Sequence, residues 1–135
     1  MLKLIIGVKG TGKTKTLISM VNEAVEKSNG AVICIEKGDK LRFDVKYQAR
    51  LIDTDEYFVD DAQSLFGFVA GILASNHDVT DLFIDSALKI CQNDNEGFDK
   101  FLDEMNSLVG KLDINVVMTS SIPTETASET VKKYI

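Results

Sequence analysis

The fold that we expect is decided by one stretch near the N-terminus, Gly7-Val8-Lys9-Gly10-Thr11-Gly12-Lys13-Thr14. It fits the pattern G-x-x-x-x-G-K-[ST] at every fixed position. The apolar run Leu2–Ile6 precedes it and suits a buried parallel strand. The segment Lys13–Ser28 follows, and its apolar residues recur at helical spacing. The order of strand, glycine-rich loop and helix predicts a loop that binds phosphate.

Each part of this loop has a chemical reason. The glycines let the backbone curl so that successive N–H groups point inward, and these donors attract a di- or triphosphate together with the helix N-terminus. Lys13 would reach the β- and γ-phosphates and so act in catalysis, and the Thr14 hydroxyl would ligate Mg²⁺. We expect nucleotide contacts from the whole loop and the next residue, namely Gly7, Val8, Lys9, Gly10, Thr11, Gly12, Lys13, Thr14 and Lys15. The alternative is a glycine- and lysine-rich turn without a ligand.

A second motif, Leu82-Phe83-Ile84-Asp85, is an apolar run that ends in an acid. Ligands of open α/β sheets bind at the carboxyl ends of the strands, so Asp85 would face the phosphate loop. It would hold Mg²⁺ there, through water. Many buried strands end in Asp, and the motif is therefore informative only downstream of the loop.

With these two motifs, the chain resembles the P-loop NTPases, and within them the RecA-like branch. The resemblance implies ATP or another nucleoside triphosphate as the ligand, together with Mg²⁺. It also implies a strand with a polar sensor between the phosphate-loop strand and the Asp85 strand. Ile114–Met118 fits that strand, and it would bring Thr119 or Ser120 near the γ-phosphate. Ordinary polarity in a loop after a strand explains these two residues equally well.

The resemblance also identifies candidates for the group that orients or deprotonates water during hydrolysis. Many relatives place a glutamate directly after the acid of the second motif, but this chain has Ser86 there. RecA-like proteins can instead use a glutamate at the end of their second strand, and Glu36 occupies that position. The alternative for Glu36 is a solvated acid at a strand end. No arginine stands where it would stabilise the transition state, and Lys132 and Lys133 fit a solvated helix face better than a role in trans.

Strands alternate with helices along the rest of the chain, which predicts an α/β three-layer sandwich with a mostly parallel central sheet. This is a minimal version of the P-loop NTPase fold, in one domain over residues 1–135. The expected strands after the first are Ala31–Glu36, Leu41–Val45, Arg50–Asp53, Thr80–Asp85 and Ile114–Met118. The expected helices after the first are Ala62–Ser75, Gly97–Leu112 and a short one within Thr124–Tyr134. Residues 40–58 also allow a small hairpin.

The RecA-like strand order implies an open sheet edge. Ile114–Met118 would flank Leu2–Ile6 on one side, with the Asp85 strand next and Ala31–Glu36 beyond it. Relatives add a late core strand on the other side of Leu2–Ile6, and too little chain remains after Thr119 to supply one. Such an edge invites pairing with another chain. We expect the tail 124–135 to cover it, and a second subunit or a protein partner are the alternatives.

Composition limits the possible environments and partners. The chain has 135 residues, a net charge of −6 and 44% hydrophobic residues, which is typical of a soluble globular domain. Nucleic-acid binding is disfavoured because the basic residues are few and scattered. The apolar segment Leu65–Ala74 is too short to cross a bilayer, and no signal-peptide pattern begins the chain. Cys34 and Cys91 lack the spacing of metal ligands, and the single histidine, His77, supports no metal site or triad. These features predict a cytoplasmic protein.

The sequence therefore predicts a small cytoplasmic ATP-binding P-loop protein with weak or partner-dependent ATPase activity. A small-molecule kinase is one alternative, although such enzymes usually carry a lid with several arginines and this chain has only Arg42 and Arg50. A non-catalytic module, in which nucleotide occupancy switches a partner surface, is the other. It stays open because Ser86 cannot act as a carboxylate base.

Overall fold

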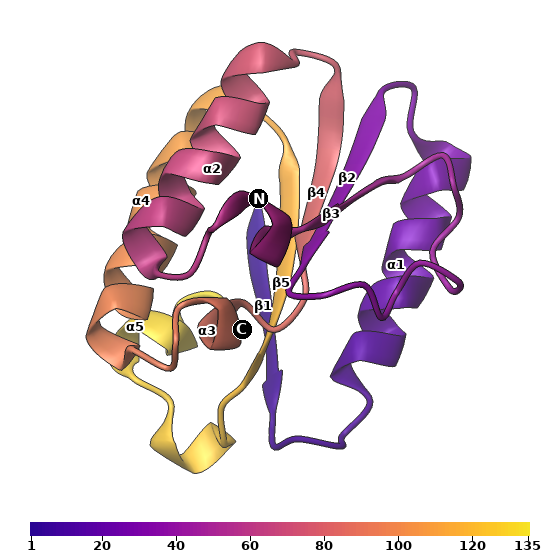
Figure 1. The fold of residues 1–135 in the computed structure, drawn as a ribbon. Coiled ribbons are helices and arrows are strands. Elements are labelled where there is room, and N and C mark those ends of the chain that lie inside the picture. The colour runs from indigo at the N-terminus through magenta and orange to yellow at the C-terminus, as the bar shows by residue number, and fades with distance from the viewer.

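A five-stranded sheet forms the centre of the protein (Figure 1), for which a computed structural model describes all residues from Met1 to Ile135. The strand order is β1-β5-β4-β2-β3, and every neighbouring pair is parallel. The strands are β1 (Leu2–Gly7), β2 (Ala31–Glu36), β3 (Arg50–Asp53), β4 (Val79–Ile84) and β5 (Asn115–Ser121). Because all strands point the same way, their carboxyl ends meet at one edge of the sheet.

Helices cover both faces of this sheet, so the molecule has three layers, as predicted. They are α1 (Lys13–Lys27), α2 (Ala62–Ser75), α3 (Ala87–Ile90), α4 (Asn95–Leu112) and α5 (Glu129–Lys132), with 3-10 turns at Thr54–Tyr57 and Thr124–Thr126. Figure 1 shows α1 on one face and α2 and α4 on the other. Successive strand residues point to opposite faces and divide between two apolar clusters. In β2, for example, Ile33 and Ile35 pack with the larger cluster, whereas Val32 and Cys34 join the cluster around α1.

The order expected for four of the strands is confirmed. β5 lies between β1 and β4, and β2 follows on the far side of β4. The short strand β3 is also found where it was predicted. It pairs in parallel with β2 and forms the second edge of the sheet, so residues 40–58 do not form a hairpin.

The predicted strand at Leu41–Val45 is wrong. These residues form a turn in which the N–H groups of Asp44 and Val45 both donate to Leu41 O over 3.0 Å. Leu41 and Val45 are buried against the α1 side of the sheet, whereas Phe43 between them is exposed. Burial at positions i and i+4 is the spacing of a helical turn, and the apparent alternation misled because Phe43 is an apolar residue left in solvent.

Two other elements differ from expectation. The short helix α3 directly after β4 was not predicted, and it is only one turn long. The tail is not one helix but a 3-10 turn and then α5, since Ala127 and Ser128 between them are extended. Both differences concern pieces of about one turn, which hydrophobic periodicity cannot detect.

The strand β1 lies at an open edge of the sheet, as predicted, and the tail reaches it. The Leu4 N–H donates to Tyr134 O over 2.7 Å. Val131 is buried in the larger cluster, and the Tyr134 hydroxyl donates to Asp103 Oδ1 of α4 over 2.7 Å. The tail therefore supplies part of the missing cover of β1. No helix has the length and apolar character needed to cross a membrane.

Candidate functional site

The glycine-rich loop joins the end of β1 to the start of α1. Gly12, the residue before the helix, has φ 84°. Because glycine has no side chain, the first turn of α1 has no side-chain cap. Gly7 has φ 152°, and a Cβ there would meet Thr11 Oγ1 at 2.8 Å. The Thr11 hydroxyl in turn donates to Val8 O over 2.8 Å. The loop is thus closed on itself, and the N–H groups that begin α1 remain free to bind an anion.

Lys13, at the end of this loop, is a buried charged residue with only 9% exposure. Its Nζ donates to Val8 O over 2.9 Å, but it takes part in none of the six ion pairs of the structure. A buried ammonium without a counter-charge is costly unless an anion approaches it. The residue therefore fits a negatively charged ligand held against the loop.

Asp85 follows β4 and collects hydroxyl groups from two other elements. Thr14 of α1 donates to Asp85 Oδ1 over 3.1 Å, and Thr119 of β5 donates to the same oxygen over 2.7 Å. The backbone N–H of Asp85 donates to Ile35 O of β2 over 2.9 Å, which fixes the residue at the sheet edge. The Thr14 hydroxyl is also 3.2 Å from Oδ2, and the Ser86 hydroxyl is 3.5 Å from it. An ionised carboxylate has about four lone-pair sites, so Oδ2 can still accept a further partner.

Ser86, the residue directly after Asp85, has the left-handed conformation with φ 56°. Its N–H donates to Thr119 Oγ1 over 2.8 Å. The next residue but one, Leu88, donates its N–H to Ser120 Oγ over 3.2 Å. Thr119 is thus part of the Asp85 cluster, whereas Ser120 holds α3 against β5. Left-handed backbone at a residue with a side chain is uncommon and tends to occur at functional sites.

These groups line one cleft of about 490 Å³ at the carboxyl ends of the strands. Four lysines line it, namely Lys9, Lys13, Lys40 and Lys89, and Asp85 is the only acidic residue in its wall. None of the four lysines belongs to an ion pair. In a chain with a net charge of −6, this concentration of unpaired positive charge selects anionic ligands.

Glu36 is close to this cleft but is not part of its wall. It is 3% exposed, and its two oxygens accept the N–H groups of Lys40 and Leu41, each over 3.1 Å. Burial raises its pKa, against the two N–H donors that lower it, and the charges of Asp85 and Asp53 add to the rise. In this arrangement Glu36 fixes the turn that carries Lys40 into the cleft.

The structure brings together most of the residues that the sequence singled out. Gly10, Gly12, Lys13, Thr14, Asp85 and Thr119 line the cleft together with Lys9. The remaining predicted residues are not in its wall: Gly7, Val8, Thr11, Lys15 and Glu36. Thr11 and Val8 are joined by the hydrogen bond that closes the loop, and Gly7 packs against Thr11. Lys15 lies in the first turn of α1 and is exposed.

Sequence reasoning missed Lys40, Lys89 and Asn93, which also line the cleft. Lys40 depends on the turn that Glu36 holds, and the other two depend on the short helix α3. Asn93 and its neighbour Gln92 have left-handed backbone, with φ 59° and 57°. Lysines in polar segments of this kind carry no periodic signal, although their position after β2 and β4 could have identified them.

Protein ligands for a metal ion are few at this site. No group of three or more histidine, cysteine, aspartate or glutamate side chains is placed to hold a metal. Asp85 and Thr14 nevertheless place a carboxylate and a hydroxyl oxygen side by side, and oxygen donors of this kind suit Mg²⁺ when phosphate oxygens and water complete its shell. The nearby thiol of Cys34 is no substitute, because burial and the charges of Glu36 and Asp85 raise its pKa to about 12.

Comparisons with protein-family models and with curated proteins find no match for this chain. The functional argument therefore depends on the residues of the cleft and their geometry.

Proposed function

We propose that this chain binds a nucleoside triphosphate, foremost ATP, with Mg²⁺ in the cleft beside the glycine-rich loop, and that it hydrolyses the nucleotide slowly or only with a partner. One observation carries the proposal. The Thr14 hydroxyl and the Asp85 carboxylate meet at 3.1 Å directly beside the buried, unpaired Lys13. A phosphate chain needs both a cation from the protein and a magnesium site, and this cleft contains the residues for both.

The roles of the individual residues follow from their positions. The uncapped N–H groups that begin α1 bind phosphate oxygens, and Lys13 turns from Val8 O to the β- and γ-phosphates. Thr14 and Asp85 would hold Mg²⁺, which neutralises charge on the phosphate oxygens when it is bound. Thr119 keeps the Asp85 carboxylate in place through its 2.7 Å bond.

Slow turnover is proposed because the cleft lacks a free carboxylate base. Ser86 carries no carboxylate, and both oxygens of Glu36 already accept backbone N–H groups. Neither arginine lines the cleft, so no guanidinium is available there to stabilise a transferring phosphoryl group. A partner that supplies the missing groups would accelerate the reaction.

The strand order supports assignment to the P-loop NTPase fold, in the RecA-like branch. The strand before the glycine-rich loop is separated from the strand before Asp85 by β5, which carries Thr119. This order is the one that the resemblance in the sequence implies. This fold assignment agrees with the roles given above to the residues of the cleft, and it implies no further residue there.

Two further functions each have one observation in their favour. Lys40 and Lys89 extend the positive wall of the cleft beyond the glycine-rich loop, which favours a kinase that also binds an anionic small molecule. The engagement of Glu36 by Lys40 and Leu41 favours a non-catalytic module whose nucleotide occupancy switches a partner surface. Analysis of the product distinguishes the three functions. An ATPase releases phosphate, a kinase transfers the phosphoryl group to the second molecule, and a non-catalytic module leaves the nucleotide unchanged.

The proposal is tested by titrating ATP, ADP and GTP into the protein with and without Mg²⁺ in a calorimeter. We expect saturable binding of a triphosphate that strengthens with Mg²⁺. At a hundred times its dissociation constant the nucleotide should add roughly 2.7 kcal/mol to the free energy of unfolding. No heat of binding and no thermal stabilisation with any of these nucleotides would overturn the proposal.

A further inference from the structure

The outer edge of β3 is the second edge of the sheet, and it has no cover of its own. β3 pairs only with β2, whereas β1 at the other edge donates the Leu4 N–H to Tyr134 O of the tail. Apart from a 3.4 Å contact from the Arg50 guanidinium to Leu51 O, the hydrogen bonds of β3 beyond its pairing with β2 involve only the Asp53 side chain. An edge of this kind presents backbone donors and acceptors to another strand.

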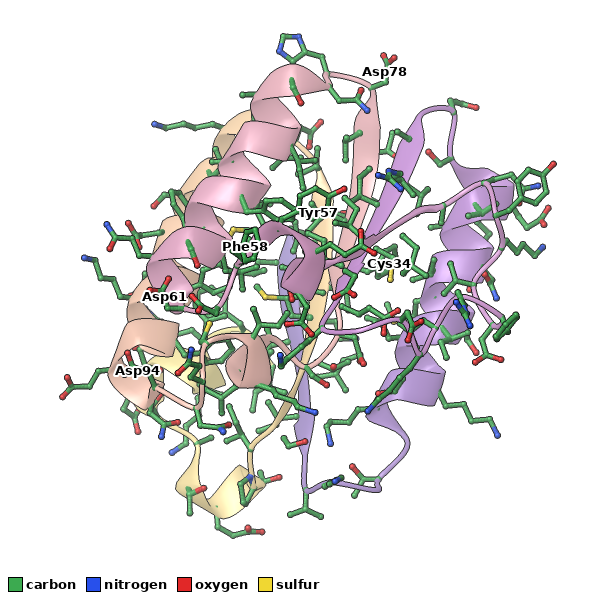
Figure 2. All side chains as sticks on the ribbon, viewed as in Figure 1. Cys34, Tyr57, Phe58, Asp61, Asp78 and Asp94 are labelled. Carbon is green, nitrogen blue, oxygen red and sulfur yellow. The ribbon has the colours of Figure 1, made fainter.

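Large aromatic side chains stand in solvent at both ends of β3. Phe43 and Tyr47, in the segment before the strand, are 85% and 91% exposed. Phe58, which follows the 3-10 turn after the strand, is 88% exposed and has φ 59°. The turn crosses in front of the strands in Figure 1, and Figure 2 labels Tyr57 and Phe58 there. Exposed aromatic side chains on both sides of one sheet edge are the kind of apolar surface that occurs at protein contact sites.

The two ends of β3 carry opposite charges. The strand begins with Arg50, and the segment before it carries Arg42 and Lys46, which pair within the chain with Asp39 and Glu26. The strand ends with Asp53, and the segment after it is acidic, with Asp55, which pairs with Lys37, and with Glu56, Asp60 and Asp61. Arg50 and Glu56 are exposed, and neither takes part in any ion pair within the chain. The unpaired charges along this edge are therefore a positive one at its start, on Arg50, and a negative one beyond its end, on Glu56.

A hollow of about 390 Å³ lies at the positive end. Its wall includes Tyr47, Ala49, Arg50 and Leu51, so it combines apolar surface with the basic side chains. The acidic end presents Phe58. The hollow at the start of β3 could therefore receive the Phe58 side chain of a second copy.

We propose that β3 is the interface of a homodimer in which two copies pair antiparallel, edge to edge, about a two-fold axis. Antiparallel pairing places the start of β3 in one copy beside the end of β3 in the other. The symmetry then brings Arg50 to the acidic turn with Glu56, and Phe58 to the hollow beside Tyr47, twice in each dimer. The sheet becomes a continuous ten-stranded one across the axis, twice the five strands of one chain.

Complementarity distinguishes this surface from a merely protected edge. A short edge strand with a charged residue is a known defence against pairing, and Arg50 alone would serve that purpose. However, Arg50 does not repel a second copy of this chain if the two-fold axis places it beside the unpaired Glu56 of that copy. The contact is small, with four strand residues from each copy, and the dimer should be weak and concentration-dependent.

Sedimentation velocity of the full chain, without nucleotide and over a wide range of protein concentrations, tests the proposal. We expect a reversible monomer–dimer equilibrium. Arg50→Glu and Glu56→Arg should each raise the dissociation constant about tenfold, because each change makes two like-charge contacts by symmetry. Phe58→Ser should weaken the dimer similarly, and Lys100→Glu on α4 is the control that should change nothing.

Mixing the two charge variants gives the decisive result. A heterodimer of Arg50→Glu with Glu56→Arg has two opposite-charge contacts, so the mixture should dimerise as well as the wild type. A general effect on folding or net charge cannot produce that recovery. A wild type that stays monomeric, or a mixture that does not recover, would overturn the proposal. Monomers that bind a single-stranded oligonucleotide through the basic segment would likewise overturn it, since that segment would then serve a different partner.

Discussion

Thr14 and Asp85 are 71 positions apart in the chain, and the hydroxyl of the first donates to the carboxylate of the second over 3.1 Å. Thr14 lies in the first turn of α1, and Asp85 follows β4. Their contact is long-range and depends on the parallel sheet. The glycine-rich loop and Asp85 both follow the carboxyl ends of strands, and these ends meet at one edge of the sheet. Under the proposed function, these two side chains would hold Mg²⁺ together.

Lys13→Ala should weaken nucleotide binding strongly. The change removes one charge-assisted contact with phosphate, worth about 1.5–3 kcal/mol, or roughly ten- to a hundredfold in the dissociation constant. Folding should not suffer, since the side chain is a buried charge without an ionic partner. Calorimetric titration with ATP and Mg²⁺ measures the effect, and Lys100→Ala, on the exposed side of α4, is the matched control. Equal affinities for the two variants would contradict the role given to Lys13.

Asp85→Asn should remove the dependence of nucleotide binding on Mg²⁺ while leaving some metal-free binding. The amide keeps the shape of the carboxylate and can still accept a bond from Thr119. It has no negative charge for the cation, so titrations with and without Mg²⁺ should give similar affinities. A variant that retained the full magnesium effect would place the metal elsewhere. Thr119→Val tests the support of Asp85 separately, and we expect a smaller loss of the same kind.

The sequence was sufficient for the parts of the site that lie next to regular elements. The glycine-rich loop, Asp85 and Thr119 each follow or precede a strand or helix with clear periodicity, and all of them have groups in the cleft. The predicted edge position of β1 is also confirmed. It depended on the strand order that the resemblance implies and on the short stretch of chain that remains after Thr119.

The turn after β2 could not be predicted in the same way. Glu36 reads as a strand-end acid, and nothing local indicates that its carboxylate accepts the N–H groups of Lys40 and Leu41. That capping interaction replaces the expected strand with a compact turn and brings Lys40 to the cleft. Its energy is a tertiary contribution of burial and hydrogen bonding, which overrides the alternating apolar pattern.

Glu36→Gln should loosen this turn. The carboxylate accepts two N–H bonds, whereas the amide can accept only with its oxygen, so one N–H loses its partner at a cost of about 1–3 kcal/mol. Burial raises the pKa of Glu36, so the folded state favours the protonated side chain. The stabilisation that comes from this protonation is complete below pH 4.5 and is lost as the pH rises through the raised pKa. Denaturant unfolding of both proteins across that pH range measures the difference.

The same variant tests the role of Glu36 in hydrolysis. Nucleotide affinity should persist, because Lys13, Thr14 and Asp85 are unchanged, and any hydrolysis should cease if Glu36 acts on water. Lys40→Ala separates this role from a positioning one. If Lys40→Ala removes hydrolysis to the same extent, Glu36 acts by placing Lys40, and a direct role for its carboxylate is contradicted.

The contact between the tail and α4 should be sensitive to acid. The bond from the Tyr134 hydroxyl, and then the bond from Lys133, lower the pKa of Asp103 below its ordinary value of 3.8. The stabilisation from ionised Asp103 is therefore present above 3.8 and is lost as the pH falls through the lowered pKa. The pKa of Tyr134 is raised to about 12, so alkaline conditions short of that leave the contact intact.

Nuclear magnetic resonance of the Leu4 amide reports this contact directly, because that N–H donates to Tyr134 O. We expect its resonance to shift as the pH falls below 3.8, and the shift to disappear in Asp103→Asn, where the tail is weakened at every pH. A Leu4 resonance that follows the same acid titration in both proteins would show that Asp103 does not hold the tail.

Deletion of residues 124–135 should expose β1 and promote association. The deletion removes the carbonyl of Tyr134 from the Leu4 N–H and the buried side chain of Val131 from the larger apolar cluster. An apolar edge with unpaired backbone groups then remains, and such edges pair with other chains. Light scattering should show larger species for the truncated chain at concentrations where the full chain scatters as a small particle. The experiment is done in the Arg50→Glu background, so that pairing through β3 does not contribute. A truncated chain that scatters like its full-length parent and unfolds at the same denaturant concentration would show that the tail does not protect β1.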